Sequence, residues 1–223
     1  TVAALEYYML GLECCNEHNV GDVQRSIEIN IGYLYLDTGM YKEARQYFLS
    51  AYARYMAAPE NERDISRLTM IYTNLAESYM LEGDMDNTAQ YIDRIEAECK
   101  PHFGEMDNIY VDSLCARFYH LIGDAEKRDM YIADLEKRLG GRVLIMDIFG
   151  DLYEFCLLML ELDRDDIVVE IINKIEEPIK KTRIANIKRK YLELKIRLYR
   201  RNNCEQKCIE AMNSFFDLSI QLE

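Results

Sequence analysis

The chain contains seven cysteines and three histidines, the residue types that usually bind structural zinc. Cys204 and Cys208 lie one helical turn apart, a spacing that could begin a zinc site. The three histidines, His18, His102 and His120, are all distant from this pair in sequence. The seven cysteines are odd in number and scattered, which is typical of reduced thiols rather than of a disulfide framework. We therefore expect buried structural cysteines, no metal site and a cytoplasmic protein.

No local motif for catalysis or cofactor binding occurs in the sequence. The only adjacent glycines, Gly140 and Gly141, lack the Gly-Lys-Ser/Thr run of a phosphate-binding loop. Neither a nucleophile elbow nor a paired-histidine motif is present. Acidic residues are abundant, but their spacing is that of solvated helix surfaces. The sequence therefore predicts that the protein is not an enzyme and has no catalytic residues, no cofactor and no metal.

The distribution of charge restricts the class of partner. The formal net charge is −13, so nucleic acids would be repelled from most of the surface. One segment is locally basic: residues 180–201 hold ten Lys and Arg and one Glu, whereas residues 161–177 are mainly acidic. Because consecutive helices usually pack antiparallel, we expect these two segments to neutralise each other. The alternatives are a basic face for an anionic ligand and an exposed face without a role.

The composition and the pattern of residues predict an all-α fold. The 223 residues include only three prolines and ten glycines, helix-forming residues dominate, and no stretch alternates over the length of a strand. No run reaches the roughly 18 uncharged apolar residues that a membrane-spanning helix needs. We therefore expect no membrane insertion, and we expect no signal peptide.

Residues 30–51 contain the pattern around which the rest of the chain is organised. Gly39 separates two helical segments and stands where a left-handed helix C-terminus is expected. Gly32 on the first segment and Ala44 on the second are small, so the two backbones could approach closely. The residues that define the pattern are Ile31, Gly32, Tyr35, Gly39, Ala44, Phe48 and Ala51.

In residue type and spacing, this pattern resembles a tetratricopeptide (TPR) repeat, a helix–turn–helix unit of about 34 residues. The resemblance implies a right-handed α-α superhelix, or solenoid, of antiparallel helix pairs, in which each unit buries its apolar face against its neighbours. In this chain the copies are spaced by about 40 residues, whereas the family's repeat is about 34 residues long. The helices are therefore expected to be longer than those of a standard repeat.

Further copies are expected along the chain within a single TPR-like domain at residues 1–223. An opening helix at 2–18 is either a capping helix or the second helix of an incomplete repeat. The helix-pair repeats are expected at residues 24–58, 65–99, 106–139, 143–177 and 183–222. Because the chain opens with Thr1 rather than Met, we expect it to be a fragment of a longer protein.

Turn, cap and breaker residues indicate the same boundaries. The turns are expected at Gly39, Gly83, Gly123, Leu162 and Asn203, with Phe155 and Leu158 in the small-residue and tyrosine places of the fourth copy. Helix caps are expected at Asp22, Asp64, Asp84 and Asp124. Seams between copies are expected at Pro59, Pro101, Gly140-Gly141 and Pro178. A packing role is expected for the tyrosines that recur at one repeat position: Tyr35, Tyr79, Tyr119 and Tyr199.

The resemblance also indicates a candidate binding site on the concave face of the first helices. In the five copies this face would hold Ile29, Tyr33 and Leu36; Thr73, Glu77 and Met80; Ser113, Arg117 and His120; Cys156 and Met159; and Glu193, Arg197 and Arg200. The candidate partner-binding residues are Tyr33, Glu77, Arg117, His120, Arg197 and Arg200. The Lys and Asn clamp with which some family members hold a peptide's terminal carboxylate is absent, because its places hold Ile29, Tyr33, Thr73 and Glu77.

The resemblance implies a non-catalytic module that binds a protein segment, a peptide or another domain of its own chain. In the length and looseness of its repeats, the sequence resembles helical regulatory or sensory domains that precede an output domain, such as a diguanylate cyclase, in bacterial signalling proteins. Two alternatives are a peptide-responsive regulator whose superhelix tightens on binding, and a dimerisation scaffold in which the fourth and fifth repeats form a homodimer interface.

Overall fold

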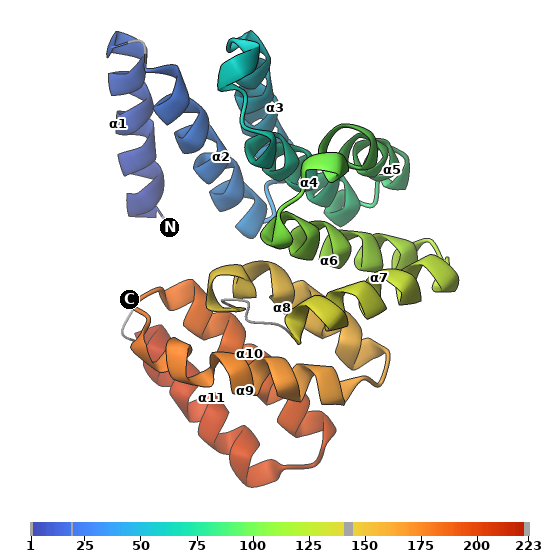
Figure 1. The fold of residues 1–223 in the computed structure, drawn as a ribbon. Helices are drawn as coiled ribbons and strands as arrows, with labels where there is room; N and C mark the ends of the chain where they lie inside the picture. The colour runs from blue at the N-terminus through green and yellow to red at the C-terminus, as the bar shows by residue number, and fades with distance from the viewer. Residues whose placement is uncertain (1, 19, 141–144, 221–223) are drawn as a thin grey trace. The chain divides into compact units, whose positions relative to one another are not determined.

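The computed structural model describes residues 2–18, 20–140 and 145–220, and these residues form eleven α-helices and no β-strand (Figure 1). The all-α prediction is confirmed. The helices are α1 (Val2–His18), α2 (Gly21–Asp37), α3 (Tyr41–Ala57), α4 (Ile65–Glu82), α5 (Met85–Arg94), α6 (Glu105–Leu121), α7 (Ala125–Leu139), α8 (Ile145–Glu161), α9 (Asp165–Lys181), α10 (Ala185–Arg201) and α11 (Glu205–Ile220). A π-helical segment (Ile95–Cys99) continues α5, and short 3-10 turns occur at Glu60–Glu62 and Lys100–His102.

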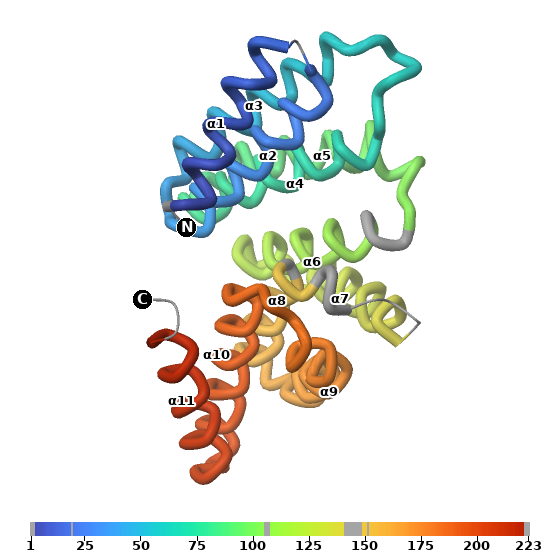
Figure 2. The backbone as a smooth tube through the Cα atoms, turned by 90° about the vertical axis from the view of Figure 1, so that its left-hand side faces the viewer, coloured from blue at the N-terminus to red at the C-terminus, as the bar shows by residue number. Residues whose placement is uncertain are grey.

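The chain divides into two compact units, Thr1–Val111 and Asp112–Glu223, and the division falls within α6. In the first unit, α1 packs on α2, α2 on α3, α3 on α4 and α4 on α5, in the order of the backbone traced in Figure 2. In the second unit, α8 packs on α9, α10 packs on both of these helices, and α11 packs on α10. Helices adjacent in sequence therefore pack together within each unit, which is compatible with a helical repeat. The single domain and the right-handed superhelix stay predictions.

One residue in the turn inside each helix pair adopts a left-handed backbone conformation. These residues are Gly39 (φ 78°), Gly83 (85°), Gly123 (79°), Asp163 (60°) and Asn203 (52°). The prediction is confirmed for four of these turns and was wrong by one position for the fourth pair, where Asp163 replaces the expected Leu162. Asp and Asn enter this region more readily than most residues, because their short polar groups can bond to the local backbone. In the fourth pair, Cys156 therefore occupies the repeat position of the small residue, and Met159 occupies the position of the recurring tyrosine.

Three of the four predicted aspartate caps are confirmed. Their carboxylates accept hydrogen bonds from backbone N–H groups in the first turns of α4, α5 and α7: Asp64 from Ser66 (3.0 Å), Asp84 from Asn87 (3.1 Å) and Asp124 from Lys127 (3.0 Å). The prediction for Asp22 was wrong, because α2 begins at Gly21 and places Asp22 inside its first turn. There its carboxylate pairs with Arg25.

The prediction that Pro178 separates two repeats was wrong as well. Pro178 lies in the last turns of α9, which continues to Lys181. Proline has no N–H for the carbonyl four residues earlier, but its own carbonyl still accepts a bond from the Thr182 N–H (3.1 Å), so the helix extends past it. Pro59 does lie between helix pairs, and Gly140 caps the end of α7. Gly141 lies outside the described residues.

Helices of one pair are held by close approach and by aromatic stacking. A methyl group at Gly32 would lie 2.3 Å from a ring carbon of Phe48, so only glycine fits where α2 meets α3. Stacked tyrosines join the two helices of the first three pairs, with ring centroids 5.6 Å (Tyr35–Tyr47), 5.8 Å (Tyr79–Tyr91) and 5.6 Å (Tyr119–Tyr131) apart. The predicted packing role of the recurring tyrosine is confirmed for these three pairs. In the fifth pair the place of the second tyrosine is Ala211, and Lys207 lies over the Tyr199 ring instead (5.8 Å).

Candidate functional site

The predicted groove residues all lie on the first helices of their pairs. The first unit carries Tyr33 on α2 and Glu77 on α4, and the second carries Arg117 and His120 on α6 and Arg197 and Arg200 on α10. The two α10 residues are exposed and the other four are half-buried. The α10 pair is therefore the part of the predicted groove that is most accessible to a partner.

Several of these residues contact neighbouring helices. The Tyr33 ring packs edge-on against Phe48 of α3, with centroids 6.2 Å apart. His120 Nε2 lies 3.4 Å from a carboxylate oxygen of Glu161 and so links α6 to α8; this contact becomes an ion pair when the imidazole is protonated. Both residues therefore have structural contacts besides any role toward a partner.

The groove prediction for the fourth pair was wrong. Cys156 and Met159 have no exposed surface, and burial raises the pKa of the Cys156 thiol. Counting from Asp163 instead of Leu162 moves the face by one residue, which places Tyr153, Leu157 and Leu160 there. A change of one residue rotates the helix face by about 100°, and on the corrected face Tyr153 and Leu160 are buried as well.

The shifted face places Tyr153 of α8 and Glu193 of α10 at the same repeat position, and the two side chains are hydrogen-bonded. Burial, followed by this bond to the Glu193 carboxylate, raises the pKa of Tyr153. Burial opposes ionisation of Glu193, yet the hydrogen bonds from Arg197 and Tyr153 outweigh it and hold the pKa of Glu193 below its ordinary value. Arg197 completes the network with an Nη–carboxylate distance of 2.7 Å to Glu193. The Arg197 side chain is thereby held in place on the exposed face of α10.

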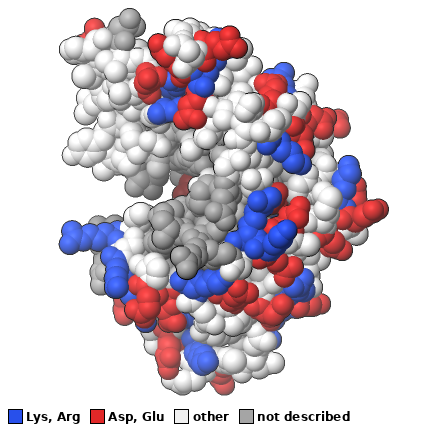
Figure 3. Space-filling model, in the orientation of Figure 1, with Lys and Arg blue, Asp and Glu red and all other residues white. Residues whose placement is uncertain are grey.

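Two other cations of the basic segment pair with acidic residues of the preceding segment. Arg201 pairs with Asp163 and lies 3.1 Å from Asp165, and Lys195 lies 3.6 Å from Glu176. These contacts join α10 to α9 and to the turn before it, which confirms the predicted charge pairing between the acidic and basic segments. On the face drawn in Figure 3, basic and acidic side chains are correspondingly intermixed.

A partly buried polar contact recurs between the two helices of the first three pairs. It joins the residue four places before the small residue of the first helix to a residue 26 places later on the second helix. The contacts are Glu28–Arg54, Tyr72–Glu98 and Asp112–Arg138, each 2.9 Å long. We call this contact the polar bridge. The corresponding places in the fourth and fifth pairs hold Leu152–Pro178 and Leu192–Leu218, which cannot form it.

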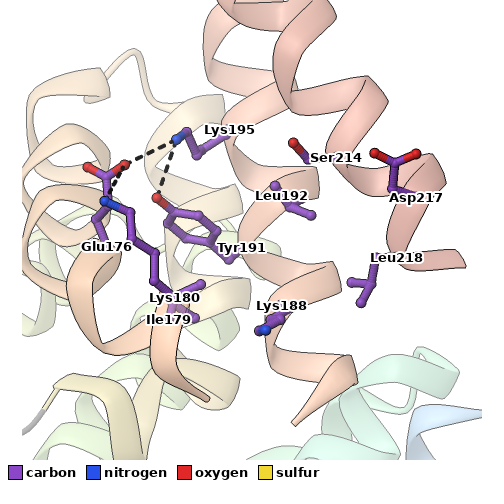
Figure 4. Close-up of a pocket in the computed structure, with 10 residues that line it drawn as sticks. All are labelled: Glu176, Ile179, Lys180, Lys188, Tyr191, Leu192, Lys195, Ser214, Asp217 and Leu218. Carbon is purple, nitrogen blue, oxygen red and sulfur yellow. Dashed lines mark hydrogen bonds and ion pairs between the residues drawn. The ribbon is translucent and has the colours of Figure 1, made fainter. Parts of the chain in front are cut away.

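A pocket of about 410 Å³ opens in the second unit at the fifth pair, where the polar bridge is missing (Figure 4). Its lining comes from the C-terminal ends of α9 and α11 and from the first half of α10. The lining residues are Glu176, Ile179, Lys180, Lys188, Tyr191, Leu192, Lys195, Ser214, Asp217 and Leu218. Lys195 Nζ donates to the Tyr191 hydroxyl (3.3 Å), and Glu176 lies between Lys195 and Lys180, at 3.6 and 3.9 Å.

Neither the polar bridge nor the pocket was predicted from the sequence. The bridge has a sequence signal that could have been found, because opposite charges recur 26 residues apart at one repeat position in Glu28–Arg54 and Asp112–Arg138. The pocket has a weaker signal. The pocket arises where Leu and Ser replace polar or large residues of an earlier repeat. These positions can be matched between repeats only after the position of the fourth turn is corrected.

All seven thiols are free. Among the described residues, no group of three or more His, Cys, Asp and Glu side chains is arranged to hold a metal ion. None of the described helices combines the length and apolar character needed to cross a bilayer.

The sequence matches no known protein family model, and it has no significant match among curated proteins.

Proposed function

We propose that the protein is a non-catalytic, TPR-like binding module of stacked helix pairs that holds a peptide or protein segment against the exposed faces of its first helices. The segment comes from another protein or from another domain of the same chain. We further propose that the module regulates the output of a larger bacterial signalling protein, for which a diguanylate cyclase is one candidate. The sequential packing of helix pairs in each unit supports this proposal.

The observation that carries the proposal is the arginine pair on α10. Lys195 and Arg201 of the basic segment face acidic residues of α9 and of the turn before it, whereas the Arg197 and Arg200 side chains lie exposed on α10. No ion pair to Arg200 occurs within the described part of the chain. Arginine is enriched in protein interfaces, because its planar group binds carboxylates through two hydrogen bonds. The partner segment is therefore expected to carry Asp or Glu opposite α10.

A selection of random phage-displayed peptides on the full chain tests this proposal. Peptides enriched on the wild-type protein should contain acidic residues and should be lost on an Arg197→Glu/Arg200→Glu variant. The matched control is Lys42→Glu/Lys137→Glu, which changes the net charge equally at exposed positions on α3 and α7. The proposal fails if no peptides are enriched, or if the enriched peptides bind the arginine variant as tightly as the control.

A dimerisation scaffold is the second candidate, and an exposed apolar stripe on α11 favours it. Ile209, Phe216 and Ile220 lie on one side of this helix and are 47%, 59% and 71% exposed. A second copy of the chain could bury this stripe. Analytical ultracentrifugation over a range of concentrations tests the idea, with Phe216→Ser/Ile220→Ser as the dissociating variant. A wild-type chain that stays monomeric at high concentration would exclude it.

A further inference from the structure

The pocket at the fifth helix pair has a filled counterpart in the first unit. In both places a first helix lies between two second helices: α4 between α3 and α5, and α10 between α9 and α11. Around α4 the space is filled by Tyr52, Tyr72, Arg94 and Glu98. The rings of Tyr52 and Tyr72 lie 5.6 Å apart, the Arg94 guanidinium lies 5.9 Å from the Tyr72 ring, and the Tyr72 hydroxyl donates to Glu98 (2.9 Å).

The corresponding residues around α10 are Glu176, Leu192, Ser214 and Leu218. The correspondence is found by counting from the left-handed turn residue of each pair, since each of these residues has the same offset from Asp163 or Asn203 as its counterpart has from Gly39 or Gly83. Both tyrosine rings and the guanidinium are therefore absent from the α10 site. The pocket lies where these groups would be.

The walls of the pocket combine apolar and charged side chains. Leu192 and Leu218 present apolar surface toward the open space, with Asp217 and Lys188 at its edge (Figure 4). Asp217, the neighbour in sequence of the residue that corresponds to Glu98, also lines the pocket and supplies a carboxylate there. No ion pair to Lys188 occurs in the part of the chain that the structure describes.

We propose that this pocket binds the tyrosine side chain of a peptide segment that carries an acidic residue beside the tyrosine. The ring packs on Leu192 and Leu218, its hydroxyl donates to the Asp217 carboxylate, and the neighbouring acidic side chain pairs with Lys188. The volume of about 410 Å³ lies within the range of roughly 300–1,000 Å³ found for ligand pockets. Lys180, Ser214 and Asp217 are exposed, so a side chain carried on a longer segment can enter from solvent.

This site is separate from the proposed groove. On α10 Arg197 lies about 180° around the helix from Lys188, and Arg200 lies about 80° from Leu192, given about 100° of rotation per residue. Neither arginine lines the pocket, so the two sites share no residue and each proposal can fail without the other.

Isothermal titration calorimetry with blocked synthetic peptides tests the proposal on the full chain. The probe is acetyl-Gly-Ser-Asp-Tyr-Asp-Ser-Gly-amide, and the comparison peptides replace its Tyr by Ala or both Asp by Asn. We expect the alanine peptide to bind at least about tenfold more weakly, because an anchor side chain dominates such contacts. The asparagine peptide should bind several-fold more weakly. If the tyrosine and alanine peptides bind equally, or if neither binds at millimolar concentration, the proposal is wrong.

Variants of the protein make the test specific. Leu192→Tyr places the chain's own ring in the pocket, as Tyr72 does in the first unit, and should abolish binding of the tyrosine peptide while the chain stays folded. Lys188→Glu should weaken the aspartate peptide several-fold and leave the asparagine peptide unchanged. Lys181→Glu, at an exposed position outside the pocket, should bind like the wild type. Undiminished binding by a folded Leu192→Tyr chain would overturn the assignment.

Discussion

At the scale of single residues, Gly32 and Gly150 are both helical glycines, but their surroundings differ. A methyl group at Gly32 would clash with the buried ring of Phe48, whereas no described atom lies within 4 Å of one at Gly150. Gly32→Ala should therefore lower the free energy of unfolding by about 1–3 kcal/mol, since the cost of overpacking exceeds the gain in helix propensity. Gly150→Ala should be neutral or raise it by up to about 1 kcal/mol. Urea denaturation of the two variants measures both effects, and equal midpoints would contradict the close approach.

The polar bridge gives a second prediction at this scale. Glu28 is buried and accepts bonds from Arg54 Nε (2.9 Å) and Ser50 Oγ (3.0 Å). Arg54→Ala would leave the buried carboxylate without its cation. Because the Arg54 side chain is 38% exposed and partly screened, we expect a loss of about 1–2 kcal/mol rather than the full cost of breaking a buried pair. Arg197→Ala removes an exposed pair and should cost less than about 0.5 kcal/mol. Chemical denaturation of both variants tests whether the loss of stability is larger for the more buried pair.

Tyr153 gives a prediction of pH dependence. Its pKa in the folded protein is raised above the value of about 10 that applies in the unfolded chain. The stability that Tyr153 contributes is therefore fully present below about pH 10 and is lost as the pH rises toward the folded pKa. The advantage of the wild type over Tyr153→Phe should be constant between pH 7 and 9 and shrink between pH 10 and 11. Urea midpoints of both proteins at these pH values provide the test, and a constant difference would contradict it.

At the scale of elements, the turn at Asp163 differs from the three that use glycine. Asp163 carries a side chain at φ 60°, and its pair with Arg201 is largely exposed, so that pair contributes little. Asp163→Gly should raise the free energy of unfolding by about 0.5–1 kcal/mol by relieving the left-handed conformation. Asn203→Gly should give a smaller gain, since Asn tolerates this region well. Thermal and urea unfolding measure both changes, and destabilisation by Asp163→Gly would show that the Arg201 pair matters more.

The elements themselves were largely predictable, because their signals are local. The left-handed glycines and the caps at Asp64, Asp84 and Asp124 each act within a few residues, and the sequence places them correctly. The errors occurred where a local signal was weak or misleading. The fourth turn has Asp163 in place of the glycine that marks other turns. Pro178 removes only one backbone hydrogen bond near a helix end.

The candidate site was less predictable, because its features depend on partners far apart in sequence. The exposure of Arg197 and Arg200 depends on how α10 packs on its neighbours, which the charges of the segment do not show. The burial of Cys156 and Met159 follows from a turn that was misplaced by one residue. The pocket depends on three helices together, and no single segment of the sequence contains it.

At the scale of the whole molecule, the left-handed residues Gly83, Gly123, Asp163 and Asn203 follow one another at intervals of 40 residues. This spacing makes the chain a candidate for shortening by whole repeats. Removal of Asp84–Gly123 would join Gly83 directly to Asp124, so that the cap of α7 follows the turn after α4. Tyr79 would then stand 12 residues before Tyr131, the spacing at which the native tyrosines stack.

We expect this excised chain to fold as a shorter array with a cooperative thermal transition and undiminished helix content per residue by circular dichroism. A deletion one residue shorter should unfold at lower temperature, since it would rotate every later helix face. The same period predicts how the chain can be lengthened by duplication. An added copy that is a whole multiple of 40 residues long needs no new turn, cap or seam.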